Sequence, residues 1–324
     1  MIFVTGATGF VGRHIVDELR RAGLPVRALV RAGRTPPAGT LPVRGDLDDV
    51  EAFSEALRGC RALIHAAALL DPVDDPVAGE RINRVATREL ARAAARQGVR
   101  CFVFVSSIAA VGIRHLPGGV RPDTPCRPDP RSVYARTKRA AELDLLSLGE
   151  PGLRLAIVRP PTVYGPGEHG NFLALTRAID SGWFLVPGDG GNRVPFCHAR
   201  NLAGALRFIV DDERCSGVLH VSDHPPLALR EVVASIARHL RRAPPHLPFP
   251  LPLARLAAVL CEAAFLPLGR PPPFSRGRLR TLSSDFALDC SALRALGWEP
   301  TAELTSALPE CIAWYRDQGL LRRR

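Results

Sequence analysis

The amino-acid sequence predicts an α/β protein built on a doubly wound parallel sheet, followed by a smaller C-terminal domain. Three observations lead to this fold class. A short apolar strand comes directly before a glycine-rich turn, and buried strands then alternate with amphipathic helices as far as residue 160. Beyond about residue 165 the alternation loosens. Alternating elements of this kind form parallel sheets whose two faces are covered by helices.

The first 30 residues carry the most specific pattern. A strand at residues 2–4 leads into glycines at positions 6, 9 and 12, and apolar residues at helical spacing continue to a stop at Gly23. A second buried strand follows at residues 26–30. Glycines let the backbone bend and approach a pyrophosphate, and the helix N-terminus offers free N–H groups. The pattern predicts a Rossmann-type dinucleotide-binding fold, with Gly6, Gly9 and Gly12 at the cofactor.

The alternation continues along the chain and sets the domain boundary. We expect helices over residues 50–60, 80–97 and 132–148, and strands over residues 61–68, 101–107 and 153–160. Residues 1–165 are expected to form the dinucleotide-binding Rossmann domain. Residues 166–324 are expected to form mainly a substrate-binding domain, with segments near 190–210 returning to the first domain.

The length, composition and net charge of the chain exclude several classes of function. It has 324 residues, 46% hydrophobic and 23% charged, which is typical of a globular protein. Its net charge is +11, but the arginines are scattered among acidic residues and aromatics make up only 6%, so we expect no nucleic-acid partner. The eight cysteines lack metal-ligand spacing, so we expect no metal. No leader precedes the first strand, and we expect a cytoplasmic protein.

The residue that ends the second strand bears on the choice of cofactor. An acidic residue there would bind the 2′-hydroxyl of the adenosine ribose and favour NAD, but this chain has Arg31, with Arg34 close behind. An arginine suits a 2′-phosphate. We therefore expect NADP, with NAD as the alternative if Arg31 only points to solvent.

A tyrosine and the only lysine of the chain lie four residues apart. Of the 43 Lys and Arg residues, the single lysine is Lys138, which follows Tyr134 in a predicted helix. Side chains at i and i+4 share one helix face. A compact ammonium stabilises the phenolate form of a neighbouring phenol, and a forked guanidinium would replace it poorly. The pair predicts acid–base catalysis, with Tyr134 as the group that moves the proton.

Together these motifs resemble those of the extended short-chain dehydrogenases/reductases, in the NAD-dependent epimerase/dehydratase superfamily. The segments that match are TGATGFVG (5–12), GDLDD (45–49), HAAA (65–68), YARTK (134–138) and RPPTVYGPG (159–167). The resemblance runs nearly end to end and implies a bound nicotinamide dinucleotide. Beyond the three glycines, the cofactor contacts that it implies are Thr8, Phe10, Val11, Asp46, Leu47, Ala66, Ala67, Ala68, Tyr134, Lys138, Pro161 and Val163.

The resemblance also implies a third catalytic residue beside Tyr134 and Lys138. It is a Ser or Thr that hydrogen-bonds the reacting oxygen, and the segment VSSIAAVG offers Ser106 and Ser107. Alignment on Gly112 places Ser107 in the catalytic position, with Ser106 as the alternative. In the implied reaction a hydride moves between the nicotinamide and a secondary alcohol or ketone carbon. Tyr134 is then the general acid or base, and Lys138 holds the nicotinamide ribose.

The segment around Phe196 bears on the substrate. Sugar-nucleotide members of the family carry an Arg two residues before this Phe and an acid after it, where this chain has Val194 and Asn201. The pattern formed by Asn192, Phe196 and Asn201 is similar to the 3β-hydroxysteroid dehydrogenase-like branch. We therefore expect a small-molecule substrate that is apolar, such as a sterol- or terpenoid-like compound. The alternatives are a nucleotide-sugar epimerase or dehydratase with recycled NAD, and a non-catalytic dinucleotide-sensing protein.

Residues 253–266 are strongly apolar and are predicted to form a helix, which is too short to span a bilayer between its flanking prolines. We interpret it either as a core helix of the substrate domain or as an apolar lid or membrane-facing element. The arginines that follow would suit an anionic surface: Arg270, Arg276, Arg278 and Arg280. The segment could therefore make a peripheral contact with a membrane. Separately, the resemblance implies a homodimer formed through the helices near 85–97 and 132–148.

Overall fold

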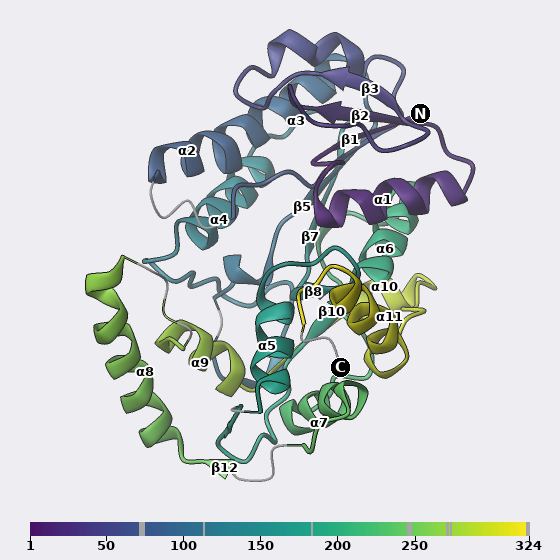
Figure 1. The fold of residues 1–324 in the computed structure, drawn as a ribbon. Coiled ribbons are helices and arrows are strands. Elements are labelled where there is room, and N and C mark those ends of the chain that lie inside the picture. The colour runs from purple at the N-terminus through teal and green to yellow at the C-terminus, as the bar shows by residue number, and fades with distance from the viewer. Residues whose placement is uncertain are drawn as a thin grey trace.

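The computed structural model describes residues 1–70, 75–112, 114–182, 184–244, 248–269, 272 and 274–321, so that Arg270 lies outside the described residues. Figure 1 shows the central sheet with its helices in the upper part of the molecule and a mainly helical region below it.

Seven parallel strands form the central sheet, in the order β11-β7-β5-β4-β1-β2-β3. They are β1 (Ile2–Thr5), β2 (Val26–Val30), β3 (Leu41–Arg44), β4 (Ala62–His65), β5 (Cys101–Val105), β7 (Arg154–Arg159) and β11 (Gly217–His220). Every residue of β1, β4 and β5 is buried, because helices cover both faces of the sheet. This architecture confirms the predicted α/β class with a doubly wound parallel sheet.

Helices lie on both faces of the sheet. On one face α1 (Phe10–Arg21) packs against α6 (Ala199–Asp211), and on the other lie α3 (Ala86–Arg96), α4 (Val133–Leu146) and the 3-10 helix η1 (Glu51–Leu57). The helix expected over residues 50–60 is thus a 3-10 helix. The stop expected at Gly23 is present: this residue has a φ of +71°, and the N–H of Leu24 bonds the carbonyl oxygen of Leu19 at 2.9 Å.

A second apolar core lies below the sheet. Its helices are α5 (Asn171–Asp180), α7 (Leu229–Leu240) and α11 (Leu304–Asp317). Three two-stranded pairs accompany them: β6 (Leu116–Val120) with β13 (Phe286–Leu288), β8 (Thr162–Tyr164) with β10 (Phe196–His198), and β9 (Val186–Pro187) with β12 (Pro248–Phe249). Shorter elements are α2 (Pro76–Glu80), the π-helix η2 (Arg81–Val85), η3 (Ile108–Ala110) and α10 (Ser291–Ala295).

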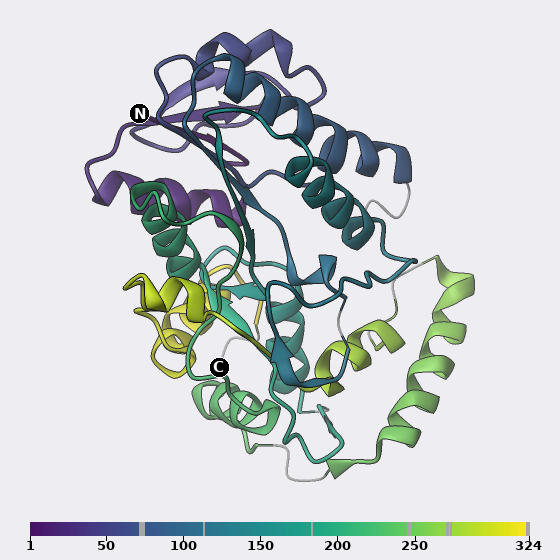
Figure 2. The same ribbon diagram turned by 180° about the vertical axis from the view of Figure 1, so that it is seen from behind.

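The chain passes between the two regions more than once. After β10 it enters α6 on the sheet face, and β11 then forms an edge of the same sheet, beyond the 190–210 segment that the sequence predicted to return. The remaining helices, α8 (Leu251–Phe265), its continuation η4 (Leu266–Leu268) and α9 (Arg276–Ser283), lie away from the sheet. Figures 1 and 2 show α8 at the outer edge of the lower region.

Candidate active site

The glycine turn after β1 leaves no room for side chains. Gly6 has a φ of +71°, and a Cβ atom there would lie 2.7 Å from the backbone nitrogen of Ala67. A Cβ atom on Gly12 would overlap the carbonyl oxygen of Gly6, because the first turn of α1 rests on this bend. The N–H of Gly9 closes the turn by bonding the same oxygen at 2.9 Å. The bend therefore requires glycine at positions 6 and 12.

The N-terminus of α1 is open to an anion. Gly9 is the N-cap and supplies no side-chain acceptor, and no acidic residue occupies the first turn, which the structure describes in full. The first N–H groups of a helix have no intrahelical partner and attract phosphate. Thr8, Phe10 and Val11 are half-buried at this end. The turn thus fits the pyrophosphate of a dinucleotide.

The ends of β2 and β3 form a depression that fits the adenosine half of such a cofactor. Arg34, Arg44 and Asp46 line it, and Arg31 is exposed directly after β2. Arg44 donates hydrogen bonds to the carbonyl oxygens of Arg31 and Arg34, at 3.4 and 3.0 Å, and so shapes the loop. Leu47 is buried in the core next to Asp46. Sequence reasoning missed Arg44, because the short strand that carries it was not predicted.

Two predicted segments border the glycine turn. Ala66, Ala67 and Ala68 follow β4, and Pro161 and Val163 follow β7. The second segment is tied to α1, because Nε2 of His14 lies 2.9 Å from the carbonyl oxygen of Pro166. Both segments therefore lie at the same end of the sheet as the turn, where the strand order reverses between β1 and β4.

A buried histidine holds the end of β4 in place. Its Nδ1 lies 2.6 Å from Oγ1 of Thr5 on β1, and its Nε2 lies 2.9 Å from Oγ1 of Thr87 on α3. Burial lowers the pKa of this residue, His65, to about 3, and the nearby charge of Lys138 acts in the same direction. The imidazole is therefore neutral at physiological pH and serves as a hydrogen-bonded link between three elements.

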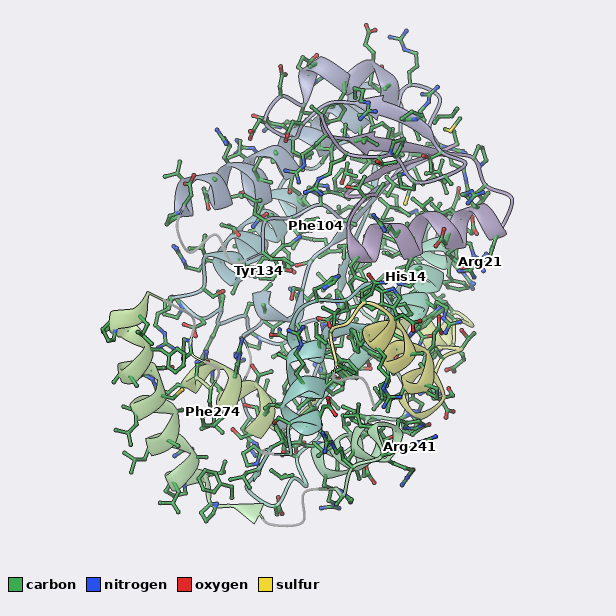
Figure 3. The ribbon with its side chains drawn as sticks, viewed as in Figure 1. His14, Arg21, Phe104, Tyr134, Arg241 and Phe274 are labelled. Carbon is green, nitrogen blue, oxygen red and sulfur yellow. The ribbon has the colours of Figure 1, made fainter. Side chains whose placement is uncertain are left out.

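The predicted tyrosine and lysine share one side of α4. Ser132 caps the helix, which places Tyr134 in its first turn. The ammonium of Lys138 donates to the carbonyl oxygen of Val105 at 2.8 Å, lies 4.4 Å from the centre of the Phe104 ring and 6.0 Å from the centre of the Tyr134 ring. Figure 3 shows Tyr134 at the end of α4 that faces the lower region, with Phe104 on the adjoining strand.

The charge of this lysine is sensitive to its surroundings. Burial lowers the pKa of Lys138 to about 7, while the negative charge of Glu142 raises it. An amine that is almost fully buried destabilises the fold, and such groups gather where chemistry needs them. Lys138 can therefore exchange its proton near neutral pH.

The two candidate serines have different partners. Ser106 is buried, and its hydroxyl donates to Oε1 of Glu142 at 2.6 Å. Ser107 is half-buried, and its hydroxyl accepts a hydrogen bond from the N–H of Ala109 at 3.1 Å, so that its own proton is available to another acceptor. The geometry favours Ser107 as the serine that reaches a substrate oxygen.

A buried ion pair lies behind these residues, and sequence reasoning missed it. Nε and Nη2 of Arg159 donate to the two carboxylate oxygens of Glu142 at 2.8 and 2.7 Å, and both side chains are excluded from solvent. Glu142 lies four residues after Lys138, so Tyr134, Lys138 and Glu142 form one stripe along α4. The sequence signal for this ion pair was an acidic residue four positions after Lys138, on the same side of the predicted helix.

Comparisons with known proteins show what this chain is similar to. The model of the NAD dependent epimerase/dehydratase family matches residues 2–220. Sterol demethylase protein B of Methylococcus capsulatus is 29% identical, over 98% of this chain and 99% of its own. Ceramide reductase of Caulobacter vibrioides is 29% identical, over 99% of this chain and 96% of its own. The solved structure of MoeE5 in complex with UDP-glucose and NAD is 28% identical, covers 98% of this chain and 99% of its own, and has a TM-score of 0.74.

Proposed function

This chain belongs to the NAD-dependent epimerase/dehydratase family, whose members are NAD-dependent enzymes, and on that premise we propose that it reduces a ketone, or oxidises a secondary alcohol, of an apolar substrate. The observation that carries the proposal is the arrangement on α4, where Tyr134 lies in the first turn and Lys138 is buried one turn behind it.

Each polar group has one role in the proposed reaction. The nicotinamide, when bound, supplies or accepts the hydride. Tyr134 gives a proton to the substrate oxygen or takes one from it, and the ammonium of Lys138 stabilises the phenolate and holds the ribose. The hydroxyl of Ser107 donates a hydrogen bond to the same substrate oxygen. Because Lys138 is buried, water screens its charge little, which strengthens its effect on Tyr134.

The contacts around Phe196 support an apolar substrate. Val194 is buried, and Nε of the neighbouring Arg193 lies 3.0 Å from Oδ1 of Asp285 in an ion pair. A nucleotide diphosphate is usually held by a cation, and in this described segment the arginine already has a carboxylate partner. The similarity to a sterol demethylase protein and to a ceramide reductase favours the same apolar class.

The exposed arginines after β2 support NADP as the preferred cofactor. Replacing Arg31 by Ala should weaken NADPH binding by about threefold or more and leave NADH binding unchanged, because only NADPH carries the 2′-phosphate. Titration of both nucleotides into the wild type and Arg31→Ala measures this. An equal effect on the two nucleotides, or no effect on either, would favour NAD instead.

A nucleotide-sugar epimerase that recycles NAD is the second candidate. It is favoured by the similarity to MoeE5, which covers nearly the whole chain and whose structure holds UDP-glucose and NAD. In such an enzyme the dinucleotide stays bound through every turnover, whereas a reductase must exchange it.

The nucleotide that accompanies the purified protein separates the two candidates. The protein is denatured, and the released nucleotide is assayed for NAD(H) and NADP(H). We expect an empty protein that NADPH stabilises against heat more than NADH does, and that consumes NADPH with hydrophobic ketones. Near-stoichiometric NAD(H) that survives gel filtration would overturn the reductase proposal in favour of the epimerase.

A further inference from the structure

The helix α8 has an exposed apolar side. The helical window Leu251–Leu268 extends beyond the helix predicted over residues 253–266, and it is long and apolar enough to cross a membrane by length and composition, so the prediction that it is too short is wrong. Its mean hydropathy is 1.7, yet only 11% of it is buried. A helix that is apolar all round is normally enclosed by protein or by lipid. The interpretation of this segment as a core helix is therefore wrong.

The inner side of α8 makes a small contact with the rest of the chain. Ala254 and Ala258 are buried against Leu279 of α9, and Phe274 packs on the same cluster (Figure 3). The outer side carries leucines at i, i+3 and i+7, which share one helix face. Their exposed fractions are 52% for Leu253, 56% for Leu256 and 60% for Leu260, and the following turn adds Leu266 at 81% and Leu268 at 61%.

The charges around α8 are mostly positive. Residues 251–280 contain five arginines and one acid, Glu262. That acid is neutralised by Arg276, whose Nε lies 2.7 Å from Oε2 of Glu262. Arg255 is exposed on α8 itself, and Arg280 reaches Asp129 across from α9. An apolar strip next to a surplus of arginines suits a lipid bilayer, whose acyl chains are apolar and whose headgroups can be anionic.

A second copy of the chain is disfavoured as the occupant of this face by charge. In a two-fold dimer through α8 the arginines of both copies would be brought toward one another, which costs free energy.

We propose that α8 is a docking helix that lies in the surface of a bilayer containing anionic phospholipids. Together, α8 and η4 contain 18 residues and span about 27 Å, close to the thickness of the hydrocarbon core of a bilayer. Because the inner side stays packed on α9, the helix lies along the membrane surface and inserts only its outer leucines. This inference does not depend on the reaction proposed above.

The test is co-sedimentation of the full chain with vesicles of phosphatidylcholine and phosphatidylglycerol in equal parts, and with vesicles of phosphatidylcholine alone. The double variant Leu256→Gln/Leu260→Gln removes two inserting side chains. Leu41→Gln/Leu146→Gln is the matched control, because those leucines are exposed to similar extents, 53% and 48%, on other elements. A heat-unfolding scan of each variant shows that it is folded.

We expect the wild type and the control to bind the anionic vesicles, and the α8 variant to bind at least about tenfold more weakly. Binding should weaken on neutral vesicles and at high salt. Equal binding by the α8 variant and the wild type would overturn the proposal, as would equal binding to neutral and anionic vesicles. The proposal would also be overturned if the wild type does not bind vesicles but forms a dimer that the α8 substitutions dissociate. That result would assign this face to a second copy of the chain.

Discussion

The glycine turn and α8 are both unusual surfaces, but their causes differ. At the turn, the restriction comes from the chain itself, because backbone atoms of Gly6 and Ala67 occupy the space that side chains would need. At α8, the outer leucines are more than half exposed, and on the proposal made above lipid would cover them. The residues of the glycine turn are thus dictated by contacts within the chain, whereas those on the outer side of α8 would be dictated by the membrane.

The largest expected effect is on catalysis, at the candidate active site beside the central sheet. Replacing Tyr134 by Phe should lower kcat by about 10²–10⁴-fold, because it removes the group that moves the proton. Cofactor affinity should change little, since the glycine turn is untouched. Steady-state kinetics and nucleotide titration measure the two quantities. Activity that persists in Tyr134→Phe would refute the catalytic assignment.

The buried amine predicts a pH dependence of stability. The pKa of Lys138 is about 7 in the folded protein and near 10.5 when the chain is unfolded. Between these values the unfolded chain binds more protons, so the free energy of unfolding should rise with pH through this window, by on the order of 5 kcal/mol in total.

Lys138→Met removes this titration and keeps a side chain of similar size. The variant should therefore be more stable than the wild type at neutral pH, and the difference should shrink as the pH approaches 10. Denaturant unfolding of both proteins across this range measures it, and other groups that titrate there cancel in the comparison. A constant difference would show that Lys138 stays charged in the folded protein.

Two glycines of one turn offer a graded steric test. Gly12→Ala should destabilise the protein by about 1–3 kcal/mol and weaken dinucleotide binding, because its Cβ atom would overlap the oxygen of Gly6. Gly9→Ala should cost less, since its Cβ atom would lie 3.2 Å from that oxygen. Unfolding and nucleotide titration of both variants test this order, and the reverse order would show that backbone contact does not set the tolerance of the turn.

The smallest effect is expected in the lower region. Nδ2 of Asn192 donates to the carbonyl oxygens of Leu282 and Ser284, at 2.7 and 3.2 Å, and so holds the end of α9 to the body. Asn192→Ala should lower the free energy of unfolding by about 1–2 kcal/mol without changing cofactor affinity. If Asn192→Ala instead weakens substrate binding and leaves the free energy of unfolding unchanged, the side chain of Asn192 contacts the substrate and does not serve mainly to hold α9.

Much of the sheet region could be predicted because its signals are local. Buried strands, the glycine spacing and the pair Tyr134 and Lys138 each lie within one element or one turn. The strand β3 was missed because most of its residues are exposed and one is a proline. The sequence favoured Ser107 through the alignment on Gly112 but left Ser106 open, because adjacent residues of an extended segment point to opposite sides and the partner of Ser106, Glu142, is distant in sequence.

The remaining misses involve partners that are distant in sequence or absent from the chain. Glu142 and Arg159 come from different elements, and no short motif joins them. For α8, an apolar helix has the same composition whether protein or lipid encloses it, so periodicity alone left both interpretations open.

The rarity of lysine gives this protein a built-in chemical reporter. Lys138 is the only lysine, and it is 1% exposed, so an amine-reactive reagent can modify the folded chain at its N-terminus but reaches the single internal amine only when α4 moves away from β5. The rate of that second modification, followed by mass spectrometry, therefore measures how often this part of the molecule opens. A dinucleotide that seals the opening would slow the labelling, so occupancy could be read without any knowledge of the substrate.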